Sequence, residues 1–501
     1  MTTGTDRRAY TLDPVTFEVL KNAFVTIVDQ MAEQILRTCY SFVIYARDFS
    51  SALCDREGNT IMQGSQDIAV HVGTLHFTCK AVIEAFGDDI HPGDVFAVND
   101  PYVGGTHFND VRIIRPVFYE GELLFFTLVR GHQQDTGGAF PGGYFPNSYD
   151  IHAEGLCIPP IKVFIGDKER EDVMGLILNN VRWPEAVRVD NYAMVATTRF
   201  AENRIHEVLR RYGKDTVMAA VREMLDRTER AVRAEITAIP DGTYSGAAAT
   251  DDDGTVLDEP VWVRVNITVK GDTLTVDFTG SDAQRKGFIN CPFGASYAIA
   301  VGSMMLLFDP SLADFHNEGS LRPITVIAPP RSVVNPSYPA TVGAAPVNVG
   351  HQIATAVGEA LSKARPNRAM AAWGKRRGDY VSSVDPRSGQ PYVRTTFDYD
   401  GSAGAVTGHD GPTGPLSIGS LATVMRSNAE EMEIRFPWRI VKWEVAPDLM
   451  GAGRWRGGGG IDWRAINEGS DGRMATGSSD GDSTPGAGAQ GGYPSPCSRT
   501  F

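Results

Sequence analysis

Apolar residues recur with two different spacings in separate segments of this chain, one typical of helices and one typical of strands. These two spacings restrict the fold more than any other feature. Between residues 14 and 35, apolar side chains recur every three or four positions after Asp13 and Pro14, which predicts an amphipathic helix capped by the aspartate. Between residues 261 and 278, apolar residues alternate on both sides of Gly271-Asp272, which predicts an antiparallel hairpin. The chain is therefore expected to be an α+β protein, a multi-layer mixed fold with antiparallel sheets, long amphipathic helices and glycine-rich loops.

Other segments follow the same two patterns and suggest a division of the chain. The expected helices cover residues 75–86, 201–238, 295–308 and 350–363, and the expected strands cover 51–54, 60–62, 94–98 and 123–130. The predicted units are an α+β domain at 1–190, a helical and β-hairpin domain at 191–370, a β-rich domain at 371–466 and a mobile tail at 467–501.

Charge and cysteine usage exclude several classes of protein. The 501 residues carry a formal net charge of −14, which argues against nucleic-acid or anionic-membrane binding because both require a basic face. Residues 1–10 lack the apolar segment of a secretion signal, and no apolar run is long enough to span a membrane. Six scattered cysteines without a CxxC pair indicate free thiols. We therefore expect a cytoplasmic protein.

Histidines and carboxylates are concentrated in two motifs that contain paired glycines. His107 and Asp110 stand three residues apart after Gly104-Gly105, and His132 and Asp135 have the same spacing before another glycine pair. Neutral imidazoles together with carboxylates suit Zn, Mn or Fe. We hypothesise a divalent metal site that uses both histidines and Asp110.

A fourth ligand must come from another part of the chain. The acid favoured by its context is Asp48, in Ala46-Arg47-Asp48-Phe49-Ser50. The alternative is that His107 and His132 only form hydrogen bonds to loop backbone, because a histidine and an aspartate three residues apart are a weak signal.

Motifs for other chemistries are absent or out of context. The chain has no GxxxxGK[ST] phosphate loop and no HExxH motif. One GxSxG match, at residues 477–481, lies in the low-complexity tail without the flanking strand and helix that a nucleophile elbow requires. The glycine-rich segment 451–460 has the wrong spacing for a dinucleotide loop. We interpret it as turns beside a strand, with an interface role open for Arg454 and Arg456.

The motifs occur in a combination that is typical of one family. They are Leu12-Asp13-Pro14-Val15-Thr16-Phe17-Glu18-Val19, Arg47-Asp48-Phe49-Ser50, Asn99-Asp100-Pro101-Tyr102, Gly104-Gly105-Thr106-His107 with Asp110, Gly131-His132, Asp135-Thr136-Gly137-Gly138, Glu154-Gly155, Pro159-Pro160, Ile239-Pro240-Asp241-Gly242, Asp277-Phe278-Thr279-Gly280-Ser281 and residues 451–458. From about residue 11 to residue 465, the chain resembles the hydantoinase B family. That family includes N-methylhydantoinase B, the C-terminal part of 5-oxoprolinase, the B-type component of caprolactamase, and components of acetone and acetophenone carboxylases.

The resemblance implies a division of labour between two subunits. A hydantoinase A-type partner binds ATP and phosphorylates the carbonyl or enol oxygen of the substrate, and the B-type subunit holds a metal and completes the reaction. The family's metal ligands map onto His107, Asp110 and His132, with Asp48 as the fourth. This arrangement also accounts for the missing phosphate loop, since the nucleotide lies in the partner.

The reaction expected from the resemblance is ATP-dependent hydrolysis of a hydantoin, oxoproline-like or lactam ring. Asp135 would orient the attacking water or act as a base, and Glu154 or Asp100 would hold the metal ligands in place. For each of these acids, the alternative is a hydrogen-bond acceptor in a loop.

Two other functions stay open, namely a component of a ketone carboxylase and a non-catalytic scaffold. Unlike the family pattern, the chain ends in a Gly/Ser-rich stretch at Phe501, so a truncated C-terminus is a further expectation.

Overall fold

The computed structural model describes most of the chain between residues 12 and 499. The residues within that range that it does not describe are 65–66, 69–70, 72, 376–377, 396–400, 415–417, 419–423, 470–471 and 478–479. The polar N-terminal ten residues and Ser479 of the GxSxG match therefore lie outside the described residues.

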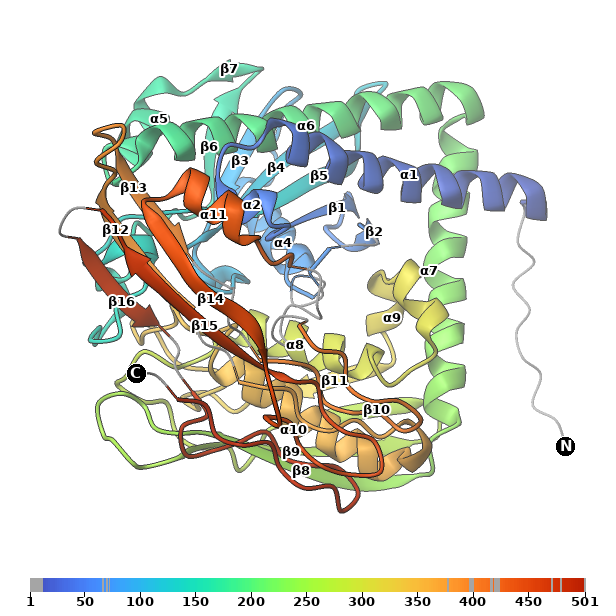
Figure 1. Ribbon diagram of the computed structural model, residues 1–501. Coiled ribbons are helices and arrows are strands. Elements are labelled where there is room, and N and C mark those ends of the chain that lie inside the picture. The colour runs from blue at the N-terminus through green and yellow to red at the C-terminus, as the bar shows by residue number, and fades with distance from the viewer. Residues whose placement is uncertain are drawn as a thin grey trace, which may run out of the picture.

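A seven-stranded antiparallel sheet forms the upper half of the molecule (Figure 1). Its strands, in spatial order, are β2 (Thr60–Gln63), β1 (Phe49–Asp55), β5 (Glu122–His132), β4 (Asp110–Tyr119), β3 (Val95–Val98), β6 (Ile161–Ile165) and β7 (Lys168–Glu169). Strand β1 begins shortly after the short helix α2 (Phe42–Tyr45), and the turn at residues 55–59 joins β1 to β2 as predicted.

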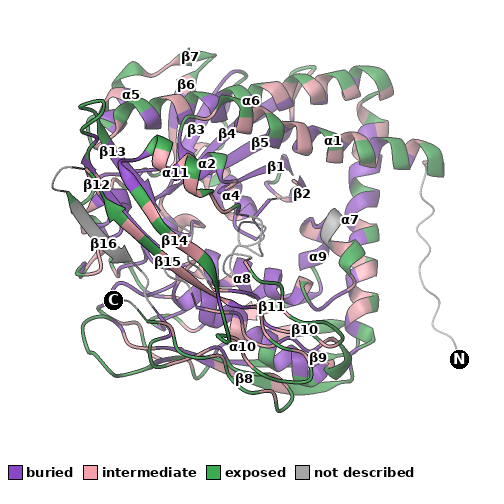
Figure 2. Cartoon of the chain, viewed as in Figure 1, coloured by how far each residue is buried: buried purple, intermediate pink, exposed green. Residues whose placement is uncertain are grey.

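The two faces of this sheet are buried in separate hydrophobic cores, because side chains alternate along each strand. On one face, Val111, Ile113 and Val129 pack with the long helices α1 (Pro14–Thr38) and α6 (Pro184–Tyr212). On the opposite face, Ile114 and Leu128 pack with α4 (Leu75–Phe86), the helix predicted at those residues. Figure 2 shows the central strands buried and the outer surfaces of α1 and α6 exposed.

Helix capping explains where the long helices begin and end. The Asp13 carboxylate accepts hydrogen bonds from the backbone N–H groups of Val15 and Thr16, which confirms the predicted N-cap. The helix predicted at 201–238 is instead two helices, α6 and α7 (Lys214–Thr237), which meet at Gly213 with φ 79°. A positive φ favours glycine and ends a helix, and Figure 1 shows α7 running down to the lower half of the molecule.

A four-stranded sheet and two buried helices form the lower half. The strand order is β11 (Ile324–Ile327), β10 (Thr273–Asp277), β9 (Val261–Lys270) and β8 (Gly242–Thr250), and of the three pairs in this sheet only β10–β11 is parallel. The predicted hairpin is therefore β9–β10. Helices α8 (Phe293–Met305) and α10 (Val349–Ala364) share one hydrophobic core with this sheet.

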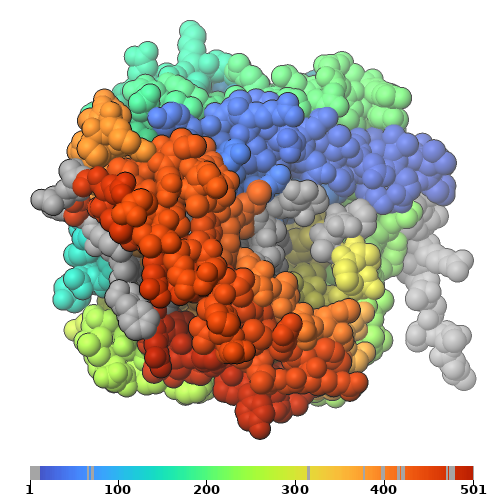
Figure 3. Space-filling model, viewed as in Figure 1, coloured from blue at the N-terminus to red at the C-terminus, as the bar shows by residue number. Residues whose placement is uncertain are grey.

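The C-terminal segments add two small antiparallel sheets across one side of the molecule. The first has the order β13 (Pro391–Thr395), β12 (Gly378–Val384) and β16 (Arg473–Gly477), and the second pairs β14 (Trp438–Ala446) with β15 (Gly460–Asn467). In the space-filling view, these orange and red segments cover the front below α1 (Figure 3). The remaining helices are α5 (Glu171–Leu178), α9 (Glu318–Leu321), α11 (Ala429–Arg435) and the 3-10 turns η1 (Pro101–Val103), η2 (Pro141–Gly143), η3 (Ile151–Ala153), η4 (Pro310–Phe315) and η5 (Pro366–Arg368).

The observed elements confirm the α+β class, and the predicted domain boundaries stay a prediction, although two of them fall within continuous elements. The boundary between residues 190 and 191 falls inside α6, where the Asp190 carboxylate accepts hydrogen bonds from the backbone of Tyr40 and Ser41. The boundary at 466 falls within β15. In the part of the chain that the structure describes, no helix is long and apolar enough to cross a membrane.

The tail predicted to be mobile is hydrogen-bonded to the lower sheet where the structure describes it. The Asp251 carboxylate accepts hydrogen bonds from the backbone N–H groups of Asp482 and Thr484, at 2.7 Å each. Buried Asp480 lies 3.2 Å from Nζ of buried Lys375 and accepts a 2.7 Å hydrogen bond from Gln352. Composition did not reveal these long-range contacts, because they depend on tertiary partners.

The Asp480–Lys375 ion pair generates a stability prediction. Asp480→Ala leaves the Lys375 ammonium buried without its carboxylate, which we expect to cost about 3 kcal/mol. Urea unfolding followed by circular dichroism measures this loss. The double variant Asp480→Leu with Lys375→Met should recover most of it, because no buried charge is then unpaired. Unchanged stability of Asp480→Ala would show that the tail does not pack in this way in solution.

Asp67 generates a prediction about pH. Burial raises the pKa of this carboxyl to about 7, although its oxygen accepts hydrogen bonds from the backbone of Ser51 and Gly64. The folded chain therefore holds the proton to a higher pH than the unfolded chain does. The stability contribution is complete below the ordinary pKa of 3.8 and is lost as the pH rises through about 7.

Asp67→Asn should flatten this dependence, because an amide does not titrate. We expect the stability of the wild type relative to the variant to fall by about 4 kcal/mol at most between pH 4 and pH 8. Urea denaturation at a series of pH values measures the difference. Parallel stability curves for the two proteins would contradict the assignment.

Candidate metal centre

The pairing of β4 with β5 places two candidate ligands opposite each other. Asp110, the first residue of β4, is in register with His132, the last residue of β5. Oδ1 of Asp110 lies 3.6 Å from Nδ1 of His132, and both side chains are buried. Directly opposite residues on antiparallel strands project from the same face, so this register alone brings the carboxylate and the imidazole together.

His107 reaches the same point from a constrained loop between β3 and β4. Asn99 anchors the loop, because its amide donates to the carbonyl groups of Phe108 and Leu156, at 2.9 Å each. Gly104 adopts φ 86°, and a Cβ built on it would lie 2.3 Å from Cβ of Phe77. Only glycine fits this close approach of the loop to α4, which explains the glycine before the histidine motif.

The three side chains form a compact cluster with the donor set of a metal site. One ligand atom each from His107, Asp110 and His132 can be chosen so that all three atoms lie within 4.8 Å of one another. The Nε2 atoms of both histidines are buried without a hydrogen-bond partner among the described residues. Because buried polar atoms are normally paired, these orphaned nitrogens fit a ligand role, and the mixed N/O set suits Zn, Mn or Fe.

Electrostatics keep His107 and Asp110 in the protonation states that ligation requires. Burial lowers the pKa of His107, against the opposing effect of Asp110, so its imidazole is neutral. Burial also disfavours ionisation of Asp110, but the charge of Arg130 and the hydrogen bonds from His107 and His132 outweigh it and hold the pKa of this carboxyl well below its usual range. A neutral imidazole and an ionised carboxylate are the forms that bind metal.

Asp48 lies beside this cluster and outside the group of three. Its Oδ2 atom is 3.5 Å from Nδ1 of His132, and its carbonyl oxygen accepts a 3.0 Å hydrogen bond from the His132 backbone. Arg47, with φ 69°, precedes it at the entry to β1. The position is compatible with a fourth ligand.

Asp135 is buried in a network of backbone donors. Its carboxylate accepts hydrogen bonds from the backbone N–H groups of Gly137, Gly142 and Arg182, and from the Arg182 guanidinium at 3.0 Å. With both oxygens engaged, the geometry favours the interpretation of Asp135 as a loop acceptor over that of a base.

Glu154 joins the upper half of the molecule to the lower half. Both of its oxygens accept from the backbone N–H of Val342, at 3.0 and 3.2 Å. Burial raises the pKa of this carboxyl well above its usual range. Asp100 instead caps η1 by accepting from the backbone of Tyr102. Both acids therefore hold loops in place, and neither is among the three clustered side chains.

The sequence analysis missed several side chains around the cluster. Tyr144 lies edge-on to His107, with 6.1 Å between ring centroids, and stacks at 3.7 Å on Tyr380 from β12. Arg112 and Arg130 stand next to Asp110 and His132 on the same face of the sheet. Strand alternation was sufficient to find the two arginines, whereas no local signal connects Tyr380 with Tyr144.

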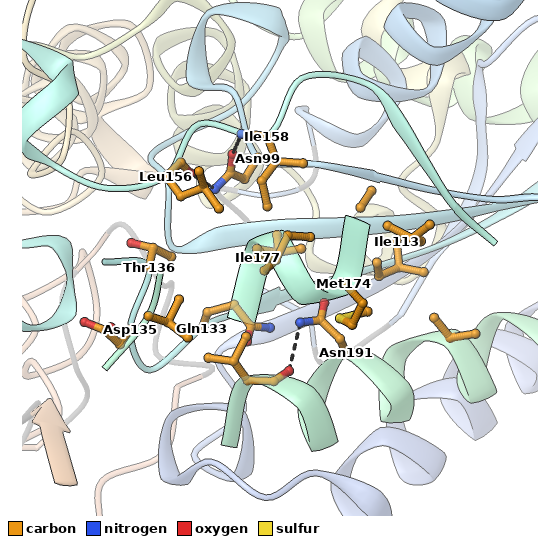
Figure 4. A pocket seen from close by; sticks show the side chains of 16 residues that line it. Asn99, Ile113, Gln133, Asp135, Thr136, Leu156, Ile158, Met174, Ile177 and Asn191 are labelled. Atoms are coloured by element: carbon orange, nitrogen blue, oxygen red, sulfur yellow. Dashed lines mark hydrogen bonds between the residues drawn. The ribbon is translucent and has the colours of Figure 1, made fainter. Parts of the chain in front are cut away.

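A mainly apolar pocket lies behind the cluster (Figure 4). It is lined by Val111 and Ile113 from the face of β4 opposite to Asp110, and by residues of α5 and α6 such as Met174 and Asn191. The buried side-chain amide of Gln133, next to His132, makes no hydrogen bond to any described residue. This pocket is separated from the cluster by the sheet.

The chain is thus an α+β protein with a buried cluster of two histidines and one carboxylate that can hold a divalent ion. It belongs to the hydantoinase B/oxoprolinase family, whose model matches residues 13–501.

Two named relatives share most of the chain. The beta subunit of caprolactamase from Pseudomonas jessenii is 36% identical over 457 residues, which cover 90% of this chain and 77% of that protein. The B-type component of a putative D-/L-hydantoinase from Pseudomonas sp. (strain NS671) is 31% identical over 465 residues, which cover 89% of this chain and 77% of that protein.

Two solved structures have the same fold. The crystal structure of ATP-dependent caprolactamase from Pseudomonas jessenii superposes with a TM-score of 0.87 at 32% identity, covering 95% of this chain and 82% of that one. A nucleotide-free acetone carboxylase superposes with a TM-score of 0.89 at 20% identity, covering 97% of this chain and 66% of that one, which is a likeness of fold alone.

Metal content tests the ligand set. We expect His107→Ala and His132→Ala each to lose most bound metal, because each removes one of three clustered donors, and Asp48→Asn to lower metal affinity at least about tenfold. Elemental analysis of purified protein measures the metal, and circular dichroism checks the fold. The control is His206→Ala, since this histidine on α6 bonds the Phe118 carbonyl oxygen at 2.8 Å, away from the cluster. If both histidine variants retain their full metal content, His107 and His132 are not metal ligands.

Proposed function

We propose that this chain is the B-type subunit of an ATP-dependent cyclic amide hydrolase that acts on a hydantoin, an oxoproline-like ring or a lactam. The observation that carries the proposal is the buried cluster of His107, Asp110 and His132, in a chain that is 36% identical to the beta subunit of a caprolactamase. A hydantoinase A-type partner would phosphorylate the carbonyl oxygen of the ring, and this subunit would hydrolyse the activated product.

Amide resonance explains why such a reaction needs two sites. An unstrained lactam carbon is a poor electrophile, whereas phosphorylation of the oxygen gives a more electrophilic, imidate-like carbon. Water adds to this carbon and the ring C–N bond breaks with protonation of the nitrogen, which leaves an open-chain acyl phosphate. A second water then hydrolyses the acyl phosphate to a carboxylate and inorganic phosphate. His107, Asp110 and His132, with Asp48 as the proposed fourth ligand, would hold a divalent ion, and such an ion would supply water of lowered pKa as a nucleophile near neutral pH. The side chains themselves exclude bulk water, because the three clustered residues are all buried.

Neighbouring acids act in this proposal mainly by positioning. Asp135 fixes the loop after His132 through its bonds to Gly137 and Arg182. Glu154 fixes the segment at Val342, in the lower half of the molecule. For Asp135 to orient water directly, one of its carboxylate oxygens would have to release one of its present hydrogen-bond donors and accept a hydrogen bond from water instead.

The partner and the compartment are part of the same proposal. The sequence contains no phosphate loop, so the ATP site is assigned to the A-type subunit in a stable heteromer. All six cysteines are free, which supports a reducing compartment such as the cytoplasm. Zn, Mn and Fe are equally compatible with the donor set.

Reconstitution with the A-type subunit tests the function. With hydantoin, 5-oxoproline and ε-caprolactam as candidate substrates, we expect ring opening that requires ATP and both subunits and is independent of bicarbonate. His132→Ala should lower the rate at least about 100-fold in the same complex, which is about 2.7 kcal/mol of transition-state stabilisation. Product formation and phosphate release, followed by chromatography and a colorimetric assay, measure both quantities.

Controls separate this function from its two alternatives. Turnover of acetone or acetophenone that requires bicarbonate would assign the chain to ketone carboxylation instead. Turnover by the isolated chain with ATP would refute the division of labour. An unaffected rate in His132→Ala, with His206→Ala as the matched variant, would support a scaffold role.

A further inference from the structure

Two buried arginines lie directly beside the metal-ligand cluster. Arg112 on β4 is in register with Arg130 on β5, two residues along from the Asp110–His132 pair. All four side chains project from the face that packs against α4, because the strands alternate. Arg112 is 0% exposed and Arg130 is 2% exposed.

These guanidinium groups lack the partners that buried charges normally have. One Arg130 nitrogen forms an ion pair with Asp110, but its Nε and Nη1 atoms make no hydrogen bond to a described residue. None of the three Arg112 nitrogens has a hydrogen-bond partner in the described chain, and no carboxylate there forms an ion pair with it.

Among the described residues, two other buried arginines, Arg115 and Arg394, each have a carboxylate partner, although two nitrogens of each also lack a hydrogen bond. Arg115, three residues after Arg112 on the opposite face of β4, contacts Asp167 at 3.0 Å and Glu202 at 3.3 Å. Arg394 contacts both oxygens of Asp379. Of these four buried arginines, therefore, only Arg112 has no carboxylate partner among the described residues.

The backbone keeps Arg112 in this position. A Cβ built on Gly105 would lie 2.8 Å from Nη1 of Arg112 and 2.6 Å from the Asp100 carbonyl oxygen. The glycine thus makes room for the guanidinium against the loop that carries His107. On the adjacent strand β1, Ser50 is in register with Arg130, and the Ser50 hydroxyl is hydrogen-bonded to buried His71. Ser50, His71, Arg112 and Arg130 thus form a buried polar layer next to the candidate metal ligands.

Charge counting indicates what this layer accommodates. A buried charge is costly unless it is paired, and like charges on directly opposite residues repel. Arg130 shares its one carboxylate partner, Asp110, with the metal-ligand cluster, and Arg112 has no hydrogen-bonded carboxylate among the described residues, so this layer carries an excess of positive charge. A dianion with several acceptor oxygens balances this charge and matches the fork geometry of guanidinium.

We propose that Arg112 and Arg130 form a binding site for a phosphate dianion next to the metal centre. The inference rests on the proposed function, in which the substrate arrives phosphorylated and inorganic phosphate leaves. The site holds the phosphoryl oxygens while the ring carbon faces the metal ligands, and it retains the released phosphate until the product departs.

Phosphate binding by the full, zinc-loaded chain tests this site directly. Titration calorimetry and thermal unfolding should detect inorganic phosphate, with a melting temperature that rises with phosphate concentration. Arg112→Met and Arg130→Met should each weaken phosphate binding at least about tenfold with zinc content unchanged, and Arg112→Lys should weaken it less. The matched control is Arg115→Met, the same change on the other face of β4, which should bind phosphate like the wild type.

A second ligand distinguishes the two sources of phosphate. Methyl phosphate, a dianionic monoester, should bind as tightly as inorganic phosphate if the site receives the substrate's phosphoryl group, and more weakly if it receives only the released product. Equal affinity of the wild type and both methionine variants for both ligands overturns the site, even if lactam hydrolysis is intact. If phosphate binding depends on the arginines but the complex opens no ring, the phosphate site is supported and only the proposed function is contradicted.

Discussion

The hydrogen-bonded pairing of β4 with β5 is the constraint on which the candidate site depends. It sets Asp110 opposite His132 and Arg112 opposite Arg130. The same pair of strands therefore positions two of the candidate metal ligands and the two arginines beside them. A slip by one residue would turn each strand's side chains to the other face, where α1 and α6 form an apolar core. The burial of both faces therefore protects the register, and the register determines the chemistry.

The cluster also lies where distant parts of the chain meet. Tyr144 brings Tyr380 of the C-terminal sheet against His107, and Glu154 binds the backbone at Val342, 188 residues later. The surrounding wall is thus assembled from three separate segments, although the clustered residues come from one sheet and the loop that enters it. Such an arrangement excludes water through long-range packing while it leaves the ligand geometry to local pairing.

Sequence reasoning succeeded where information was local. The Asp13 cap, the α4 helix and the β9–β10 hairpin follow from spacing and turn residues, and His107, Asp110 and His132 stood out as a motif and do lie together. It failed where partners are remote. Gly213 interrupts one predicted helix by backbone conformation, and polar, glycine-rich composition concealed the docking of Asp480 onto Lys375. Arg112 and Arg130 were detectable from strand alternation, but their lack of partners appears only in three dimensions.

The contact between Asp251 and residues 482–484 has a consequence for the order of folding. These groups are 231 to 233 positions apart, so closing this loop is entropically expensive and comes late. The strands and loops that carry Asp48, His107, Asp110 and His132 lie within the first 132 residues, and their helical cover ends at Tyr212. Because chains fold from the N-terminus during synthesis, a nascent chain can assemble these four side chains on the ribosome well before the contact at Asp251 forms. Assembly of the candidate ligands and completion of the fold are therefore separable steps.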